Sequence, residues 1–165
     1  MRTLIRLFVV LLPWPFRRRA LTWLYGYRLH ETSRMGIAWV FPKELILGAG
    51  ASIGHLTVVK GLDTLSLAEH ASVGRLNWIT AYPSGQLPHF AHLASRSPSL
   101  VLGEHAAVTN RHIIDCTERV VIGRYATVAG FRSQILTHSI DLRACRPGGA
   151  PARGRSRQPG RHCEG

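Results

Sequence analysis

The residues of this chain that are best suited to proton transfer and polar recognition gather between residues 108 and 141. This stretch reads VTNRHIIDCTERVVIGRYATVAGFRSQILTHSID and contains Asn110, Asp115 and the pair Thr137-His138. An imidazole accepts a proton near neutral pH without a large shift of its pKa, so the histidines are the candidates for a general base. Taken alone, His138 would be an ordinary surface histidine at a turn, because the chain contains nine histidines.

The cysteines do not predict a metal site or a disulfide framework. They are odd in number and lack the spacing of metal ligands. A reducing, cytosolic compartment fits such a set best. The three are Cys116, Cys145 and Cys163.

Apolar residues recur every six positions through the middle of the chain, which sets the frame for the polar stretch. A period of six differs from the helical period of about 3.6, and the extended segments are too short for a free-standing sheet. The pattern predicts coils in which each short strand points one aliphatic side chain inward, and stacked coils then bury a continuous column. The series are Leu29, Met35, Phe41; Leu47, Ile53, Val59; Leu67, Val73, Ile79; Leu102, Val108, Ile114; and Ile122, Val128, Ile135.

Small residues mark the expected corners of these coils. Four positions after the first anchor of each series, the chain has Ser33, Ala51, Ala71, Ala106 or Ala126. Small side chains allow a tight corner before the next strand. The jump from the anchor at 67 to the anchor at 102 leaves an insertion at residues 82–100, which we expect to leave a corner as a loop.

The N-terminal segment, residues 1–28, differs from the repeat. Its apolar run LIRLFVVLLPWPF is followed by Arg17-Arg18-Arg19, and it is shorter than the roughly 20 residues that span a bilayer. We expect a short helical, amphipathic segment. It is either an interfacial anchor, with apolar side chains in the headgroup boundary and arginines on anionic lipid, or a cap on the open end of the repeat.

The C-terminal segment, residues 143–165, contains no Val, Ile, Leu, Met, Phe, Tyr or Trp. A segment with nothing to bury is expected to be disordered. Because the repeat stops abruptly, the segment is either a natural basic tail or out-of-frame translation that truncates the protein.

The formal net charge of +12 is concentrated in these two end segments. Residues 1–28 carry +6 and residues 143–165 carry +5, whereas residues 29–142 carry only +1. A nucleic-acid-binding domain needs its cations on the folded binding face. The charge distribution therefore disfavours a nucleic-acid partner.

The repeat and the polar stretch together resemble the hexapeptide-repeat acyltransferases, in particular the maltose, galactoside, nodulation-type and polysaccharide O-acetyltransferases. The matching elements are Asn110, Asp115, Ile122-Gly123 and Thr137-His138. The resemblance implies an all-β fold, a left-handed parallel β-helix of triangular cross-section. Three hexapeptides make one coil, so residues 29–142 would form about five coils.

The same resemblance implies acetyl transfer from acetyl-CoA to a sugar hydroxyl, in surface-polysaccharide or glycolipid synthesis. His138 would be the general base, Asn110 would hold the acceptor sugar, and Asp115 would either bind the acceptor or orient a histidine. The hydroxyl would attack the thioester directly, without an acyl-enzyme and without a metal. It also implies a homotrimer. The cysteines and the N-terminal segment add the expectation of a cytoplasmic location with peripheral contact at the inner face of the plasma membrane.

Two alternatives come from other functional classes. One is an inactive, truncated β-helix scaffold, because members of the family have further coils after this histidine that form much of the acetyl-CoA groove; the chain as given would then have little or no activity. The other is a metal enzyme like the γ-class carbonic anhydrases, whose paired histidines lie five residues apart. That spacing is missing here, and we expect loop and face positions for His89, His92, His105 and His112.

Overall fold

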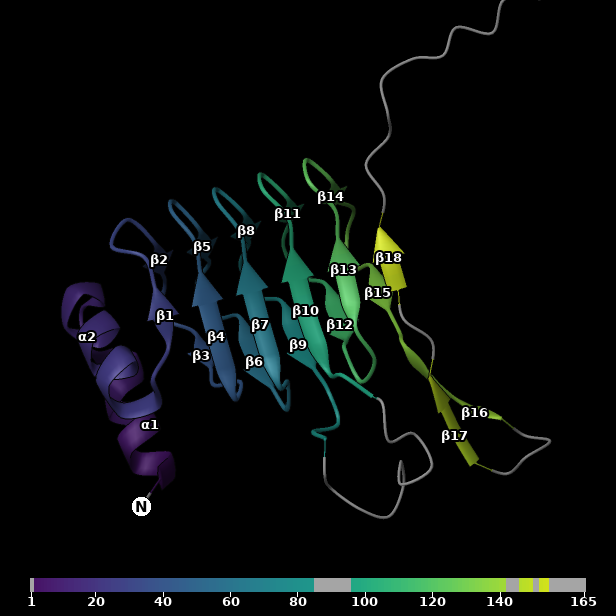
Figure 1. The fold of residues 1–165 in the computed structure, drawn as a ribbon, viewed down its shortest axis with the longest axis horizontal. Coiled ribbons are helices and arrows are strands. Elements are labelled where there is room, and N and C mark those ends of the chain that lie inside the picture. The colour runs from purple at the N-terminus through teal and green to yellow at the C-terminus, as the bar shows by residue number, and fades with distance from the viewer. Residues whose placement is uncertain (1, 85–95, 142–145, 150–151, 155–165) are drawn as a thin grey trace, which may run out of the picture.

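The computed structural model describes residues 2–84, 96–141, 146–149 and 152–154. Within these residues two helices, α1 (Arg2–Leu11) and α2 (Trp14–Tyr25), precede short parallel strands that wind into a β-solenoid (Figure 1). Two of its three faces have five stacked strands each. The prediction of an all-β parallel helix of about five coils is therefore confirmed.

The strands form three faces, and the chain passes from face A to face B to face C in every coil. Face A contains β1 (Arg28–Leu29), β4 (Glu44–Leu47), β7 (Thr64–Leu67), β10 (Ser99–Leu102), β13 (Val120–Ile122) and β18 (Ala152–Gly154). Face B contains β2 (Arg34–Met35), β5 (Ser52–Ile53), β8 (Ser72–Val73), β11 (Ala107–Val108) and β14 (Thr127–Val128). Face C contains β3 (Trp39–Val40), β6 (Val58–Lys60), β9 (Trp78–Thr80), β12 (Ile113–Asp115) and β15 (Gln134–Ile135).

The aliphatic anchors stack in register inside these faces. On face A, Leu47 pairs with Leu67 and Leu67 with Leu102, and all three are buried. One anchor was predicted wrongly: Val40, not Phe41, pairs with Val59 and enters the interior. The physical reason is the helical layer, which offers the bulky Phe41 ring a separate site. There the ring packs against Tyr25 and lies under the Arg6 guanidinium.

The two helices cover the first coil of the solenoid. Trp14 Nε1 donates a hydrogen bond to the Ser33 carbonyl at 2.7 Å. Arg17 is buried and donates to the carbonyls of Val10, Met35 and Gly36. Arg17 therefore holds the helices on the coil, and it is not one of the arginines that face outward.

The insertion leaves the solenoid between faces C and A, at the C–A corner, after β9, and it returns at β10. Its central residues, 85–95, lie outside the described residues. In the segment expected to be disordered, the structure describes two short strands, β17 (Arg146–Gly149) and β18. β17 pairs with β16 (His138–Asp141), and β18 adds to face A beside β13. The rest of that segment lies outside the described residues.

Candidate functional site

The candidate site lies at the C–A corner of the last two coils. Asp115 is the final residue of β12, and His138 follows β15 in the next coil. Because side chains alternate along a strand, the inward Ile114 leaves the Asp115 carboxylate directed away from the interior. His138 Nδ1 lies 2.8 Å from Asp115 Oδ2. The two residues are 23 positions apart in the chain, and the stacking of coils brings them together.

The Asp115 carboxylate is surrounded by hydrogen-bond donors. The backbone N–H and the hydroxyl of Thr137 lie 3.1 and 2.8 Å from Oδ2. The Thr117 hydroxyl donates to Oδ1 at 2.7 Å. With His138, four donors converge on one buried carboxylate, which fixes its orientation against the imidazole.

These contacts determine the ionisation of Asp115. Burial raises the pKa of its carboxyl, but the hydrogen bonds from Thr117, His138 and Thr137 outweigh burial and hold the pKa below its ordinary value. The carboxylate is therefore ionised near neutral pH and can only accept. His138 Nδ1 consequently carries the proton and donates, which leaves Nε2 as the basic nitrogen of the ring.

The exposure of the pair suits a reaction with an outside molecule. The Asp115 side chain is 9% exposed, whereas the His138 side chain is 47% exposed. A buried anion beside a half-exposed imidazole is the geometry of a positioned general base. Of the two roles expected for Asp115, orienting a histidine is the one that this contact would serve.

Thr117 is a site residue that the sequence reasoning missed. Its hydroxyl donates to Asp115 and accepts from the Tyr82 N–H at 3.2 Å. The Arg96 guanidinium also donates to the Tyr82 and Thr117 carbonyls. The Asp-x-Thr spacing of Asp115 and Thr117 is typical of turns in which an Asp side chain accepts a local hydrogen bond, and it could have predicted this contact. The base of the insertion is thus fastened beside the Asp115–His138 pair.

Asn110 lies at the opposite end of β12, at the corner between faces B and C. Its Oδ1 accepts a hydrogen bond from the Arg75 N–H of the preceding coil at 2.7 Å. His55 makes the equivalent contact two coils earlier, where its Nδ1 accepts from the Ile37 N–H. Within one chain Asn110 and His138 therefore lie at different corners. The Asn110 side chain instead joins two neighbouring coils through its hydrogen bond with the Arg75 N–H.

We expect Asn110→Ala to lower the free energy of unfolding by about 1 kcal/mol, because the Arg75 N–H loses its acceptor at a partly solvated corner. Urea unfolding of both proteins measures this change. The resemblance assigns Asn110 to an acceptor sugar, and the acceptor KM of the same variant would test that assignment separately. An unchanged stability would contradict the structural role.

The sequence predicts a loop or face position for His112, and this prediction is wrong. The side chain is buried inside the prism. Its Nε2 lies 2.7 Å from Thr109 Oγ1, and its backbone N–H donates to Asn77 Oδ1. Burial lowers the pKa of this imidazole. His105 lies at an exposed corner, stacked between His70 and Tyr125, whereas His89 and His92 lie outside the described residues.

The lowered pKa of His112 predicts a loss of stability in mild acid. Below about pH 6.5 the His112 imidazole is protonated in the unfolded chain, whereas in the folded chain it stays neutral to a lower pH. The free energy of unfolding is therefore fully present above that pH and falls as the pH falls, by up to about 1.4 kcal/mol per pH unit. Urea unfolding between pH 7.5 and 5 should show a weaker pH dependence for His112→Gln than for the wild type. The exposed His70→Gln is the control and should keep the wild-type slope; equal slopes for all three proteins would contradict the prediction.

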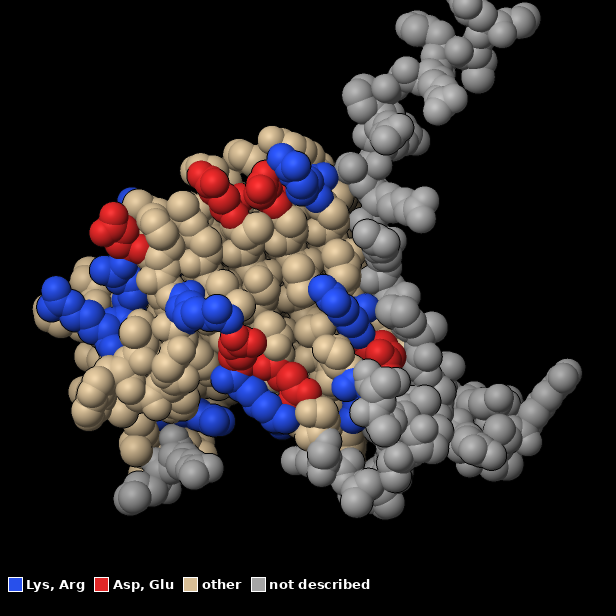
Figure 2. Space-filling model, in the orientation of Figure 1, with Lys and Arg blue, Asp and Glu red and all other residues tan. Residues whose placement is uncertain are grey.

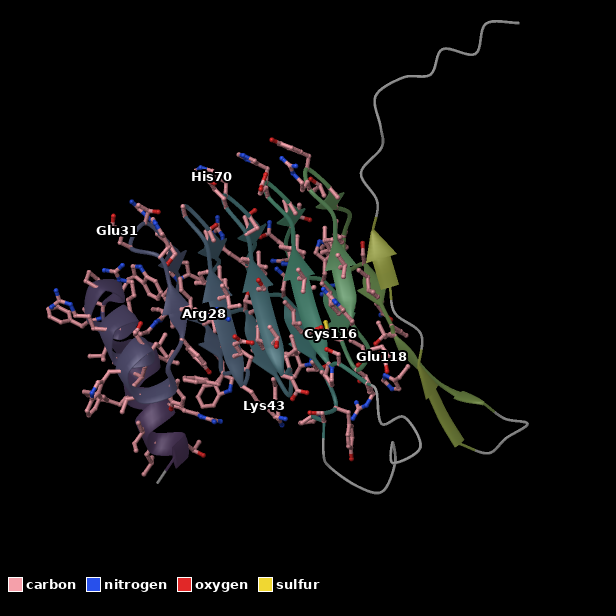
Figure 3. All side chains as sticks on the ribbon, viewed as in Figure 1. Arg28, Glu31, Lys43, His70, Cys116 and Glu118 are labelled. Carbon is pink, nitrogen blue, oxygen red and sulfur yellow. The ribbon has the colours of Figure 1, made fainter. Side chains whose placement is uncertain are left out.

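Cys116 is excluded as a nucleophile by its position. Its side chain is fully buried in the core, and burial followed by the nearby Asp115 charge raises the pKa of the thiol. Figure 3 shows its sulfur within the solenoid, while Glu118 lies at the outer edge. Among the described residues, no three or more His, Cys, Asp or Glu side chains are grouped to hold a metal ion.

The site therefore combines a half-exposed imidazole, a buried carboxylate that accepts several hydrogen bonds and the two ends of the insertion, all at one corner of a parallel β-solenoid. Comparisons with protein-family models, with curated proteins and with solved structures found no match to this chain.

Proposed function

We propose that this chain is an acyltransferase of the hexapeptide-repeat type, which transfers an acetyl group from acetyl-CoA to a sugar hydroxyl. The observation that carries the proposal is the contact between the buried Asp115 carboxylate and Nδ1 of the half-exposed His138. The same two residues match the motif of the O-acetyltransferases, and the solenoid is the architecture that this resemblance implies. Surface-polysaccharide or glycolipid synthesis is the expected setting.

In this mechanism acetyl-CoA supplies the acyl group as a thioester. His138 Nε2 takes the proton of the acceptor hydroxyl as its oxygen bonds to the thioester carbonyl carbon. The Asp115 carboxylate stabilises the imidazolium that forms and keeps its Nδ1 proton in place. When the carbon–sulfur bond breaks, Nε2 returns the proton to the departing thiolate, so the base is regenerated and no acyl-enzyme is needed.

The proposal is tested by incubating the full chain with acetyl-CoA and a panel of monosaccharide and oligosaccharide acceptors. Acceptor-dependent release of free thiol, with an acetylated sugar identified by mass spectrometry, supports it. Thiol release that no acceptor stimulates, or none above the rate in buffer, contradicts it and favours the scaffold alternative.

A further inference from the structure

The outer side of α1 is apolar and α2 adds exposed aromatic side chains, although the inner side of both helices covers the first coil. On α1 the exposed residues follow helical spacing, so they form one stripe. On α2, Phe16 and Trp23 are also exposed, and Trp23 is 85% exposed. We call this set the apolar helical face; it consists of Leu4, Leu7, Phe8, Leu11, Phe16 and Trp23.

Cations border the apolar helical face, and residues 1–28 contain no acid. Arg18 and Arg19 line a shallow hollow together with Thr22, Trp23 and Leu29. Figure 2 shows basic side chains and uncharged surface over this end of the molecule, with an acidic side chain at its upper edge, where Figure 3 labels Glu31. An apolar stripe beside arginines complements the headgroup boundary of an anionic bilayer, where apolar rings enter the acyl region and arginines meet phosphate.

A second copy of the chain fits this face less well. A two-fold contact would place the same patch of both copies together. The Arg18 and Arg19 cluster of one copy would then face like charges with no acid from residues 1–28 to neutralise it. Among the described helices none is long and apolar enough to cross a membrane.

We propose that α1 and α2 form a docking surface for an anionic lipid bilayer, with the apolar helical face in the headgroup boundary. Each large side chain that enters the boundary is removed from water, which supplies the binding energy. Arg18 and Arg19 add attraction to anionic lipid, which salt weakens. Binding therefore needs both the stripe and the negative charge of the lipid.

The test uses the full chain with vesicles of phosphatidylcholine, with and without phosphatidylglycerol, in a sedimentation assay. We expect binding to the anionic vesicles only. Phe8→Ser should weaken it by about tenfold or more, because a side chain that is 68% exposed in solution loses its place in the bilayer. Phe131→Ser is the matched control: this ring is 72% exposed at the far end of the solenoid, and binding should be unchanged.

Trp23 supplies a second readout. Its fluorescence should be quenched by brominated lipid, and Trp23→Phe should remove the quenched part of the signal. The double variant Arg18→Gln/Arg19→Gln should lose most of the dependence on anionic lipid. Unchanged melting temperatures show that the variants fold.

Three results would overturn the proposal. The first is a wild-type chain that fails to sediment with anionic vesicles. The second is Phe8→Ser weakening binding no more than Phe131→Ser does. The third is a concentration-dependent oligomer in analytical ultracentrifugation that Phe8→Ser dissociates, because the face would then be an interface between copies of the chain.

Discussion

Replacing His138 with alanine is expected to lower the rate of acceptor-dependent thiol release from acetyl-CoA by about 10²–10⁴-fold, because the attacking hydroxyl loses its general base. The imidazole is half exposed, and its Nδ1 contact is to Asp115. Its removal should therefore reduce kcat far more than it changes the acceptor KM. Initial rates with a thiol-reactive chromophore measure the effect.

The matched control for this variant is His70→Ala. The His70 side chain is 53% exposed, close to the 47% of His138, but it lies at the corner between faces A and B. We expect the wild-type rate for this control. If both variants lose activity equally, or if His138→Ala retains the wild-type rate, His138 is not the base. A wild-type chain without acceptor-dependent activity would favour the scaffold alternative.

Asp115→Asn should lower the same rate by about 10²-fold or more, through the tautomer of His138. The carboxylate accepts from Nδ1–H in the wild type. An amide at this position can turn its NH₂ group toward Nδ1, which then becomes the acceptor, so the proton moves to Nε2 and the basic nitrogen is lost. In the proposed mechanism Asp115 would thus be a positioning residue whose effect passes through the imidazole.

The tautomer is measurable without turnover. Long-range ¹H–¹⁵N correlation spectra should show His138 with its proton on Nδ1 in the wild type and on Nε2 in Asp115→Asn. Asp63→Asn is the control, since Asp63 also lies at the C–A corner and pairs with Lys43 at 2.6 Å. It should change neither the tautomer nor the rate. A wild-type His138 with its proton on Nε2 would contradict the assignment.

The lowered pKa of Asp115 determines the pH range in which its carboxylate stabilises the fold. A carboxyl with a lowered folded pKa contributes stability above its ordinary range and loses it as the pH falls through the folded pKa. The base chemistry of His138 should therefore not be limited by protonation of Asp115 near neutral pH. We expect mild acid to act on the fold through His112 instead.

The sequence predicted the solenoid well because its interior has a simple rule, one aliphatic side chain per strand at a fixed spacing. Leu47, Leu67 and Leu102 obey it and lie in register. The prediction of Phe41 as an inward anchor is wrong because the helical layer provides an alternative site for a large ring. A period of six carries no information about that layer.

The candidate site was predictable only in part. Asp115 and His138 were singled out through a resemblance, but their contact depends on how two coils stack, with one extra residue in the last turn. The donor set around Asp115 was not foreseen, since Thr117 belongs to no apolar repeat. The position of Asn110 at the opposite end of β12 follows from the strand itself, because a residue before a strand and one at its end lie at different corners.

The order β3, β6, β9 and β12 along face C separates the helical layer from the Asp115–His138 pair. Four steps of about 4.8 Å place β15, which precedes His138, about 19 Å beyond β3. The helices add about 10 Å, so a surface beneath them lies about 30 Å from His138. Between the two, a hollow of about 730 Å³ includes Arg6, Lys43 and Lys60 among its lining residues. If the acyl transfer and the membrane docking proposed above both hold, an acceptor held at that surface would have to bridge this distance, which would select extended saccharides over single sugars.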